Sequence, residues 1–160
     1  MRYTIVIMHV LKFATALGGL ALLSCGSVPP VEVEAENFSR GDVTVDKQTY
    51  GKGIGVIVTL KPQAYVEYDL DLPKSGNCEI ELRYASAAPR PLRLIIDGRV
   101  VNPHAADQET GGFLPENQKW VPAGSASLAS GRHTLRLESD SVFPHIDKIR
   151  LKRIAFKIGG

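Results

Sequence analysis

The stretch Ala64-Tyr-Val-Glu-Tyr-Asp-Leu-Asp-Leu72 decides the fold of this chain. Apolar and polar side chains alternate along it with a period of two, which is typical of a strand that packs one face on a core and turns the other to water. The side chains predicted to face the core are Val66, Tyr68, Leu70 and Leu72. The stretch therefore predicts a half-buried β-strand.

The same alternation continues on both sides of this strand. In Asn77–Tyr84 it places Cys78 among core residues, and in Arg132–Glu138 it places His133 on the face of two core leucines. Gly, Pro, Asn and Asp separate further short apolar segments, and Asp97-Gly98 is a strong two-residue hairpin signal. Strands are predicted at Val31–Glu36, Val43–Asp46, Ile54–Leu60, Ala64–Leu72, Cys78–Ala85, Leu92–Asp97, Arg99–Val101, Lys119–Leu128, His133–Glu138 and His145–Arg153.

Many short strands with one polar face, and no convincing helical pattern, predict an all-β fold: an antiparallel β-sandwich. Asn102, Pro103 and His104 follow a predicted hairpin strand, so we expect them to form a turn. We divide the chain into a leader (1–24), a short tether (25–30), the sandwich (31–153) and a C-terminal tail (154–160).

The leader has the features of an export signal. It contains Arg2 and Lys12 but no acidic residue, and its uncharged run Phe13–Leu23 is too short to span a bilayer. Translation could also start at Met8. The run ends in Leu22-Leu-Ser-Cys25, which resembles the lipobox of bacterial lipoproteins, in which the Cys is lipidated after cleavage. The alternative is an ordinary secretory signal with Cys25 incidental.

Lipidation at Cys25 predicts a location in the bacterial cell envelope, on the outer membrane or the cell surface, with the lipid as membrane anchor. The chain carries 19 basic and 17 acidic residues, and loss of the leader makes these numbers equal. A neutral surface gives no electrostatic basis for binding nucleic acid. Cys78 then has no partner for a disulfide. We expect one monomeric domain.

An ordered set of short blocks makes the sequence more specific. It runs from Glu34-Ala-Glu-Asn-Phe38, through Leu82-Arg-Tyr-Ala-Ser86 and Thr110-Gly-Gly-Phe113, to Leu128-Ala-Ser-Gly131 and His145-Ile-Asp-Lys-Ile149. In that order the blocks resemble the carbohydrate-binding modules of families 6 and 35. The resemblance implies a galactose-binding-like jelly-roll sandwich that binds polysaccharide without catalysis and usually holds structural calcium.

The residues themselves also suggest a Ca²⁺ site. Glu34 and Glu36 are two apart on a predicted strand, so they should point the same way. Asp147 shares an apolar face with Ile149, and an inward carboxylate is costly unless a cation balances it. In the family that the chain resembles, the first and last strands are neighbours, which would bring the three acids together. Carboxylates and carbonyls suit Ca²⁺. Alternatively, the glutamates are solvated and Asp147 caps a turn.

The expected sugar site draws on loop aromatics, which stack on the pyranose face in the related modules. Phe113 follows a Gly pair, Tyr50 could supply an opposing wall, and Trp120 is a further aromatic candidate. His145 stands before the last strand, where the family often has Asn. Each has a structural alternative: Trp120 could lie in the core, Phe113 could fill its own loop, and His145 could only bond a neighbouring loop.

No nucleophile elbow, zinc-binding helix, phosphate loop or dinucleotide fingerprint occurs, so we predict that the chain is not an enzyme. Two functions remain. One is a polysaccharide-binding module, and the other is a structural or protein-interaction domain of the envelope that has lost sugar binding. Exposure of Tyr50 and Phe113 across a cleft would favour the first.

Overall fold

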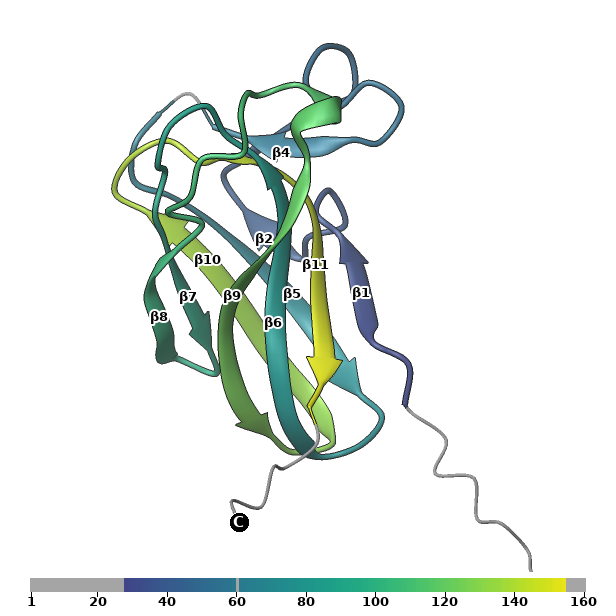
Figure 1. Cartoon of the computed structure of the whole chain (residues 1–160). Helices are drawn as coiled ribbons and strands as arrows, with labels where there is room; N and C mark the ends of the chain where they lie inside the picture. Colours follow the sequence, from purple (N-terminus) through teal and green to yellow (C-terminus); the bar gives the residue numbers. More distant parts are fainter. Residues whose placement is uncertain (1–27, 60, 155–160) are drawn as a thin grey trace, which may run out of the picture.

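A computed structural model describes residues 28–59 and 61–154 and confirms the all-β prediction (Figure 1). Two antiparallel sheets face one another. The β6 sheet has the order β3 (Thr44–Asp46), β4 (Val56–Val58), β11 (His145–Arg153), β6 (Gly76–Ala85) and β9 (Lys119–Leu128), with β1 (Val31–Glu34) also paired to β11. The β10 sheet has the order β2 (Arg40–Gly41), β5 (Ala64–Leu72), β10 (Gly131–Ser139), β7 (Leu92–Ile96) and β8 (Arg99–Ala105).

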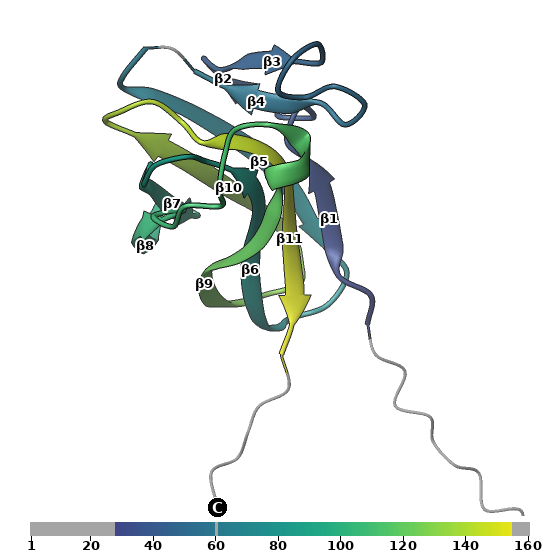
Figure 2. The same cartoon turned by 45° about the horizontal axis from the view of Figure 1, so that its top comes forward.

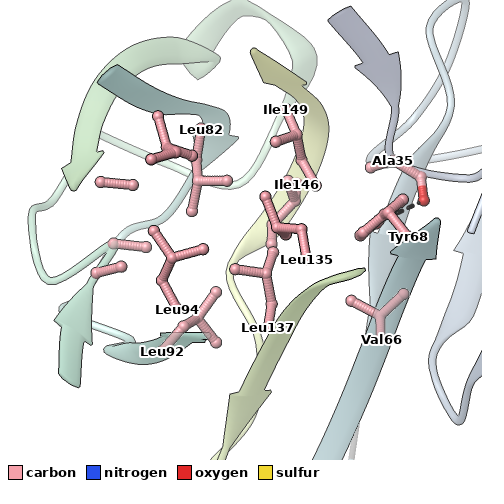
Figure 3. Close-up of a cluster of buried hydrophobic side chains, with 14 of the residues drawn as sticks. Ala35, Val66, Tyr68, Leu82, Leu92, Leu94, Leu135, Leu137, Ile146 and Ile149 are labelled. Atoms are coloured by element: carbon pink, nitrogen blue, oxygen red, sulfur yellow. Dashed lines mark hydrogen bonds between the residues drawn. The ribbon is translucent and has the colours of Figure 1, made fainter. Parts of the chain in front are cut away.

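The core lies between the sheets and consists of the side chains that the alternation predicts. Leu82 and Ile149 from the β6 sheet meet Leu94 and Leu137 from the β10 sheet, and all four are buried (Figure 3). Tyr68 is buried too, and its hydroxyl donates a 2.8 Å hydrogen bond to the carbonyl of Ala35. Cys78 is buried, which confirms its core position.

Strand β11 connects the two ends of the molecule. Its C-terminal part pairs with the first strand, with Leu151 opposite Val31, and its N-terminal part pairs with β4 at Ile146. About 20 Å separates His145 from Leu151 at the rise of a β-strand. The first and last strands thus start and end at one end of the sandwich, while the loops around β4 and the 3-10 helix η1 (Pro115–Asn117) lie at the other (Figures 1 and 2).

Several strands begin or end at other residues than predicted, because pairing with a neighbouring strand determines how far a strand extends. Strand β1 ends at Glu34, so Glu36 lies in a turn and does not share a strand face with Glu34, contrary to the prediction. Asn102–His104 continue β8, so the turn predicted there is wrong. Pro103 is tolerated because β8 is the edge of its sheet. The two-residue strand β2 was not predicted.

Several sequence predictions fall on residues that lie outside the described part of the chain. These are the leader, its lipidation site Cys25 and most of the C-terminal tail. Among the described residues, no helix is long and apolar enough to cross a membrane.

The His133 side chain contacts two turns at the end of the sandwich where β1 begins. Its Nδ1 lies 2.7 Å from Asp97 Oδ2, and its Nε2 lies 3.1 Å from the carbonyl oxygen of Ala129. Both partners are acceptors, so both contacts are hydrogen bonds only when the imidazole carries two protons. The hydrogen bond that His133 donates to Asp97 raises the pKa of His133 above its ordinary value.

We expect this contact to make stability pH-dependent. A raised pKa in the folded state means that the stabilisation is fully present below the unfolded-state pKa of ~6.5 and is lost as pH rises through the folded-state pKa. The melting temperature should therefore fall between pH 6 and pH 8.5 more in the wild type than in His133→Gln. An equal fall in both proteins, followed by circular dichroism, would show that His133 is not the source.

Candidate functional site

Three of the four aromatic candidates meet at the loop end of the sandwich. The ring centroids of Tyr50 and His145 are 4.2 Å apart, and those of Phe113 and His145 are 4.8 Å apart. His145 is only 7% exposed, whereas Tyr50 is 36% exposed and Phe113 is half-buried. We call Tyr50, Phe113 and His145 the aromatic cluster. His145 contacts both other rings and is itself buried, so Tyr50 is the ring of the cluster that is most exposed to solvent.

The carboxylate of Asp46 shapes the loop that carries Tyr50. Its Oδ1 accepts hydrogen bonds from four successive backbone N–H groups, those of Gln48, Thr49, Tyr50 and Gly51, at 2.9 to 3.3 Å. Burial alone would raise the pKa of Asp46, but the four N–H donors outweigh it and hold that pKa below the ordinary value. The sequence prediction missed this role, although an Asp at a strand end before a polar loop is a known signal for such turns.

The loop packs tightly on its own start. A Cβ atom at Gly51 would overlap the carbonyl oxygen of Asp46, so only glycine fits there. The two features together fix the path of residues 46–51 and thus the place of Tyr50.

The Phe113 loop is fixed by η1 and by His145. A Cβ at Gly112 would overlap the side-chain amide of Asn117, so Gly112 lets the loop lie against η1. The carbonyl of Phe113 accepts a 3.1 Å hydrogen bond from His145 Nδ1. Gln118 Nε2 donates to the carbonyl of His145 at 3.0 Å, and its buried Oε1 has no hydrogen-bond partner.

This arrangement sets the charge state of His145. Burial lowers its pKa below the ordinary value, and the nearby positive charge of Arg90 lowers it further. The imidazole is therefore neutral at pH 7. Because Nδ1 donates to Phe113, Nε2 carries the free lone pair and can only accept a hydrogen bond.

Arg90 joins the cluster and was not predicted from the sequence. The carbon at the centre of its guanidinium lies 4.2 Å from the centroid of the Phe113 ring, and its Nη1 donates a 2.8 Å hydrogen bond to the carbonyl of Phe143. Arg90 is half-buried. The segment Pro89-Arg-Pro91 was a usable signal, because two prolines restrict the backbone on either side of a charged side chain.

Trp120 is separate from the aromatic cluster in its contacts. It is half-buried and pairs across strands with Arg83, and the guanidinium of Arg150 lies 3.9 Å from its ring centroid. The core position offered as an alternative for Trp120 is wrong. A β-bulge at Ala123 shifts the alternation of β9, so Val121 and Ala123 are buried in place of Trp120.

The three predicted calcium ligands each meet a positive charge. Asp147 is fully buried, as predicted, and its Oδ2 lies 2.6 Å from Arg83 Nη1. Glu34 pairs with Lys148, and Glu36 Oε1 lies 3.3 Å from Lys47 Nζ. Burial raises the pKa of Asp147 although Arg83 acts against it. These pairs neutralise the carboxylates in part.

Two carboxylate oxygens are nevertheless left without a hydrogen-bond partner. Glu36 Oε2 and Asp147 Oδ1 are buried without a hydrogen-bond partner, which is costly and which an oxygen-ligated ion would correct. The Ala35 N–H donates to the Asp147 carbonyl at 2.8 Å, so the two segments are in contact. Among the described residues, no three His, Cys, Asp or Glu side chains converge tightly enough to hold a metal alone. Backbone carbonyls would have to complete the site.

A hollow of about 600 Å³ lies beside His133 at the far end of the sandwich. Two of its acids are paired, Asp97 with His133 and Asp69 with Arg40 at 2.7 Å, and no described Phe, Tyr or Trp lines it. The aromatic cluster is therefore the better candidate for a ligand-binding site, because the Phe113 ring and the guanidinium of Arg90, which has no ion-pair partner among the described residues, lie side by side there.

Fold and site together define a β-sandwich domain with an aromatic loop cluster. Among solved structures it is similar to a family 35 carbohydrate-binding module from Clostridium thermocellum (22% identity, TM-score 0.64, covering 79% of this chain and all of that module). It is also similar to the CBM35 from Paenibacillus barcinonensis (22%, 0.68, covering 78% and 99%) and to the C-terminal CBM6 of LamC, a marine laminarinase from Zobellia galactanivorans (23%, 0.65, covering 78% and 100%).

These neighbours confirm the fold that the resemblance predicted: the chain has the sandwich of family 6 and family 35 carbohydrate-binding modules. No protein-family model matches the chain, and no curated protein matches it. At this level of identity the likeness establishes the fold, and the function has to be argued from the residues.

Proposed function

We propose that this chain is a non-catalytic domain that binds polysaccharide through the aromatic cluster. The observation that carries the proposal is the contact of Tyr50 and Phe113 with His145 at the loop end of a sandwich whose structural neighbours are carbohydrate-binding modules. The axial C–H groups of a pyranose form an apolar patch, and the exposed ring of Tyr50 can cover it. His145 Nε2 and the guanidinium of Arg90 supply an acceptor and donors for hydroxyl groups.

A second function is supported by a different feature of the same cluster. An open cleft between Tyr50 and Phe113 would favour sugar binding. Their contacts indicate a filled cluster instead, because His145 packs against both rings. A filled cluster is what a structural or protein-interaction domain of the envelope would retain after losing sugar binding.

Affinity electrophoresis distinguishes the two functions. We expect the purified protein to be retarded in at least one gel of a plant and algal polysaccharide panel, and Tyr50→Ala to abolish most of that retardation because the stacking ring is lost. Trp120→Ala is the matched control, since Trp120 is an aromatic on the outer side of the β6 sheet, and it should migrate like the wild type. No retardation in any gel would contradict sugar binding.

We further propose that lipidation at Cys25 anchors the domain to the bacterial envelope. The described chain enters the sandwich at Val31, level with Leu151 and about 20 Å along β11 from His145 (Figure 1). An anchor a few residues before Val31 would hold the opposite end, with the aromatic cluster, away from the membrane. That orientation suits capture of a glycan from outside.

We also propose a structural Ca²⁺ site that includes Glu36 and Asp147, with Glu34 nearby and backbone carbonyls completing the coordination. The two unpartnered carboxylate oxygens support it. Bound calcium would supply positive charge between the turn after β1 and the start of β11.

Calcium should therefore raise the melting temperature of protein first treated with EDTA. A ligand that binds only the folded state stabilises it by about 2.7 kcal/mol at a hundredfold excess over its Kd. Magnesium is the control cation, and Glu36→Gln should reduce the calcium effect. Identical melting in EDTA and in calcium would show that Lys47 and Arg83 alone balance these carboxylates.

A further inference from the structure

Several basic side chains without an acidic partner lie at the end of the sandwich where β1 begins, which we call the β1 end. They are Lys74 in the turn between β5 and β6, Arg99 at the start of β8, Arg132 near the start of β10 and Arg153 at the end of β11. Arg153 is half-buried and the others are exposed. Among the described residues, no carboxylate lies within ion-pair distance of any of them, whereas the neighbouring Lys152 pairs with Glu79 at 2.8 Å.

The contacts of these four side chains place them on one end surface. Arg153 Nη1 donates a hydrogen bond to the carbonyl of Ser75, the neighbour of Lys74. Arg132 pairs across strands with the second-last residue of β5, just before the same turn. Arg99 lines a hollow together with the first residue after β9, where the chain turns toward β10 and Arg132. Both sheets therefore contribute positive charge to the β1 end.

Acidic side chains without an ion-pair partner have the opposite distribution. Among the described residues, the exposed ones at the loop end are Asp107, Glu109, Glu116 and Asp140. The described part of the β1 end has one, Asp71, opposite Arg132. Three cations without an acidic partner in the described chain, Lys52, Arg90 and Lys119, also lie at the loop end, where the acids outnumber them.

This distribution separates the charge of the domain along its length. Outside the leader, acidic and basic residues are equal in number, so the domain is neutral as a whole. It is nevertheless positive at the β1 end and negative at the loop end. An anionic surface would attract the first end and repel the second, which orients the domain as well as binding it.

The β1 end is also the end that the proposed lipid anchor would bring to a membrane. Strand β1 starts at Val31, opposite Leu151 near the end of β11 (Figure 1). The chain from Cys25 to Val31 can span at most about 20 Å. The unpaired cations would then lie close enough to a bilayer for its surface charge to act on them, since that field falls off over ~10 Å at 0.1 M salt.

We propose that the β1 end is a contact surface for anionic lipid headgroups, so that Lys74, Arg99, Arg132 and Arg153 hold the domain upright on the membrane. A lipid chain combined with basic residues anchors a protein more durably than a single lipid chain does. The inference goes beyond the proposed polysaccharide binding, and it uses the proposed anchor at Cys25 only to bring the domain to a membrane.

Vesicle binding by the chain carrying Cys25→Ser tests the surface without help from a lipid. Co-sedimentation compares vesicles of phosphatidylcholine alone with vesicles of equal parts phosphatidylglycerol and phosphatidylcholine. We expect the chain to prefer the anionic vesicles in about 0.05 M NaCl and to lose that preference in about 0.5 M NaCl, because salt screens the charges.

Two double variants separate the β1 end from net charge. Each basic side chain near an anionic surface strengthens binding about fivefold, so Lys74→Gln/Arg132→Gln should weaken binding to anionic vesicles about twentyfold. Lys52→Gln/Lys119→Gln is the matched control, because it removes two exposed cations from the loop end, and it should bind like the parent chain. All variants carry the same leader and tail, whose own affinity for vesicles cancels in the comparison.

Asp71→Asn supplies a test in the direction of tighter binding, which a misfolded variant would not mimic. It removes the exposed acid beside Arg132 and should strengthen binding to anionic vesicles about fivefold.

Equal binding to the two kinds of vesicle overturns the inference, and so does an equal loss of binding in the two double variants. Binding to soluble dextran sulfate without binding to anionic vesicles assigns the surface to a soluble polyanion and also overturns it. A wild-type chain found without lipid would remove the proposed anchor but not a preference for anionic vesicles, so the two failures are distinguishable.

Discussion

Arg83→Met is expected to lower the free energy of unfolding by about 3–5 kcal/mol, the range found when one partner of a buried ion pair is removed. The reason is Asp147, whose side chain is fully buried and whose Oδ2 accepts from Arg83 Nη1 at 2.6 Å. Without the guanidinium this carboxylate must either stay charged in the interior or take up a proton. Urea unfolding in the presence of EDTA, which excludes any metal contribution, measures the effect.

Two comparisons show whether burial is the cause. Glu34→Gln removes one partner of the pair with Lys148, in which both side chains are partly exposed, and its effect should stay within about 1 kcal/mol. The double variant Arg83→Met/Asp147→Leu removes both charges and should recover most of the lost stability, because apolar replacement of a whole buried pair is often neutral. A double variant as unstable as the single one would contradict the account.

Asp46→Ala is expected to weaken polysaccharide binding by about tenfold or more and to lower stability by about 0.5–2 kcal/mol, as when a side chain that caps backbone N–H groups is removed. The carboxylate oxygen that orders the Tyr50 loop is lost in this variant, and four N–H groups are left without their acceptor. Isothermal titration with a retained polysaccharide and thermal melting measure the two effects.

Asp46→Asn is the control for geometry, because it keeps an acceptor oxygen while removing the charge. It should bind more tightly than Asp46→Ala and less tightly than the wild type. The low pKa of Asp46 adds a pH dependence with a definite sign: this stabilisation is present above the unfolded-state pKa of ~3.9 and is lost as pH falls through the folded-state value. Equal binding by both variants and the wild type would contradict a role for the loop.

The fold could be predicted from the sequence because one face of most strands is buried. Strands β5, β9 and β11 have the predicted bounds, and in β5 the alternation runs over the whole strand. Strand β2 could not be found this way, because its two residues are exposed and pair only with β5. The bulge in β9 likewise depends on the neighbouring strand, and it moved Trp120 out of the core.

The candidate site was predictable only in part. Loop aromatics and the residue before the last strand can be recognised by type, and Tyr50, Phe113 and His145 do meet. That His145 packs against both rings depends on side-chain packing between distant loops. Arg90 joins the cluster through contacts with residues 23 and 53 positions away in the chain, and the segment Pro89-Arg-Pro91 marks a restricted backbone without indicating these partners.

An NMR titration of ¹⁵N-labelled protein with an oligosaccharide from a retained polysaccharide tests the central claim most directly, because it reports which residues a sugar meets. The account predicts chemical-shift changes at the amides of the Tyr50 loop, of Gly111–Leu114 and of His145, with the amides around Trp120 and His133 unchanged. Changes confined to the Trp120 and Arg150 face or to the hollow beside His133, with none in the aromatic cluster, would contradict it.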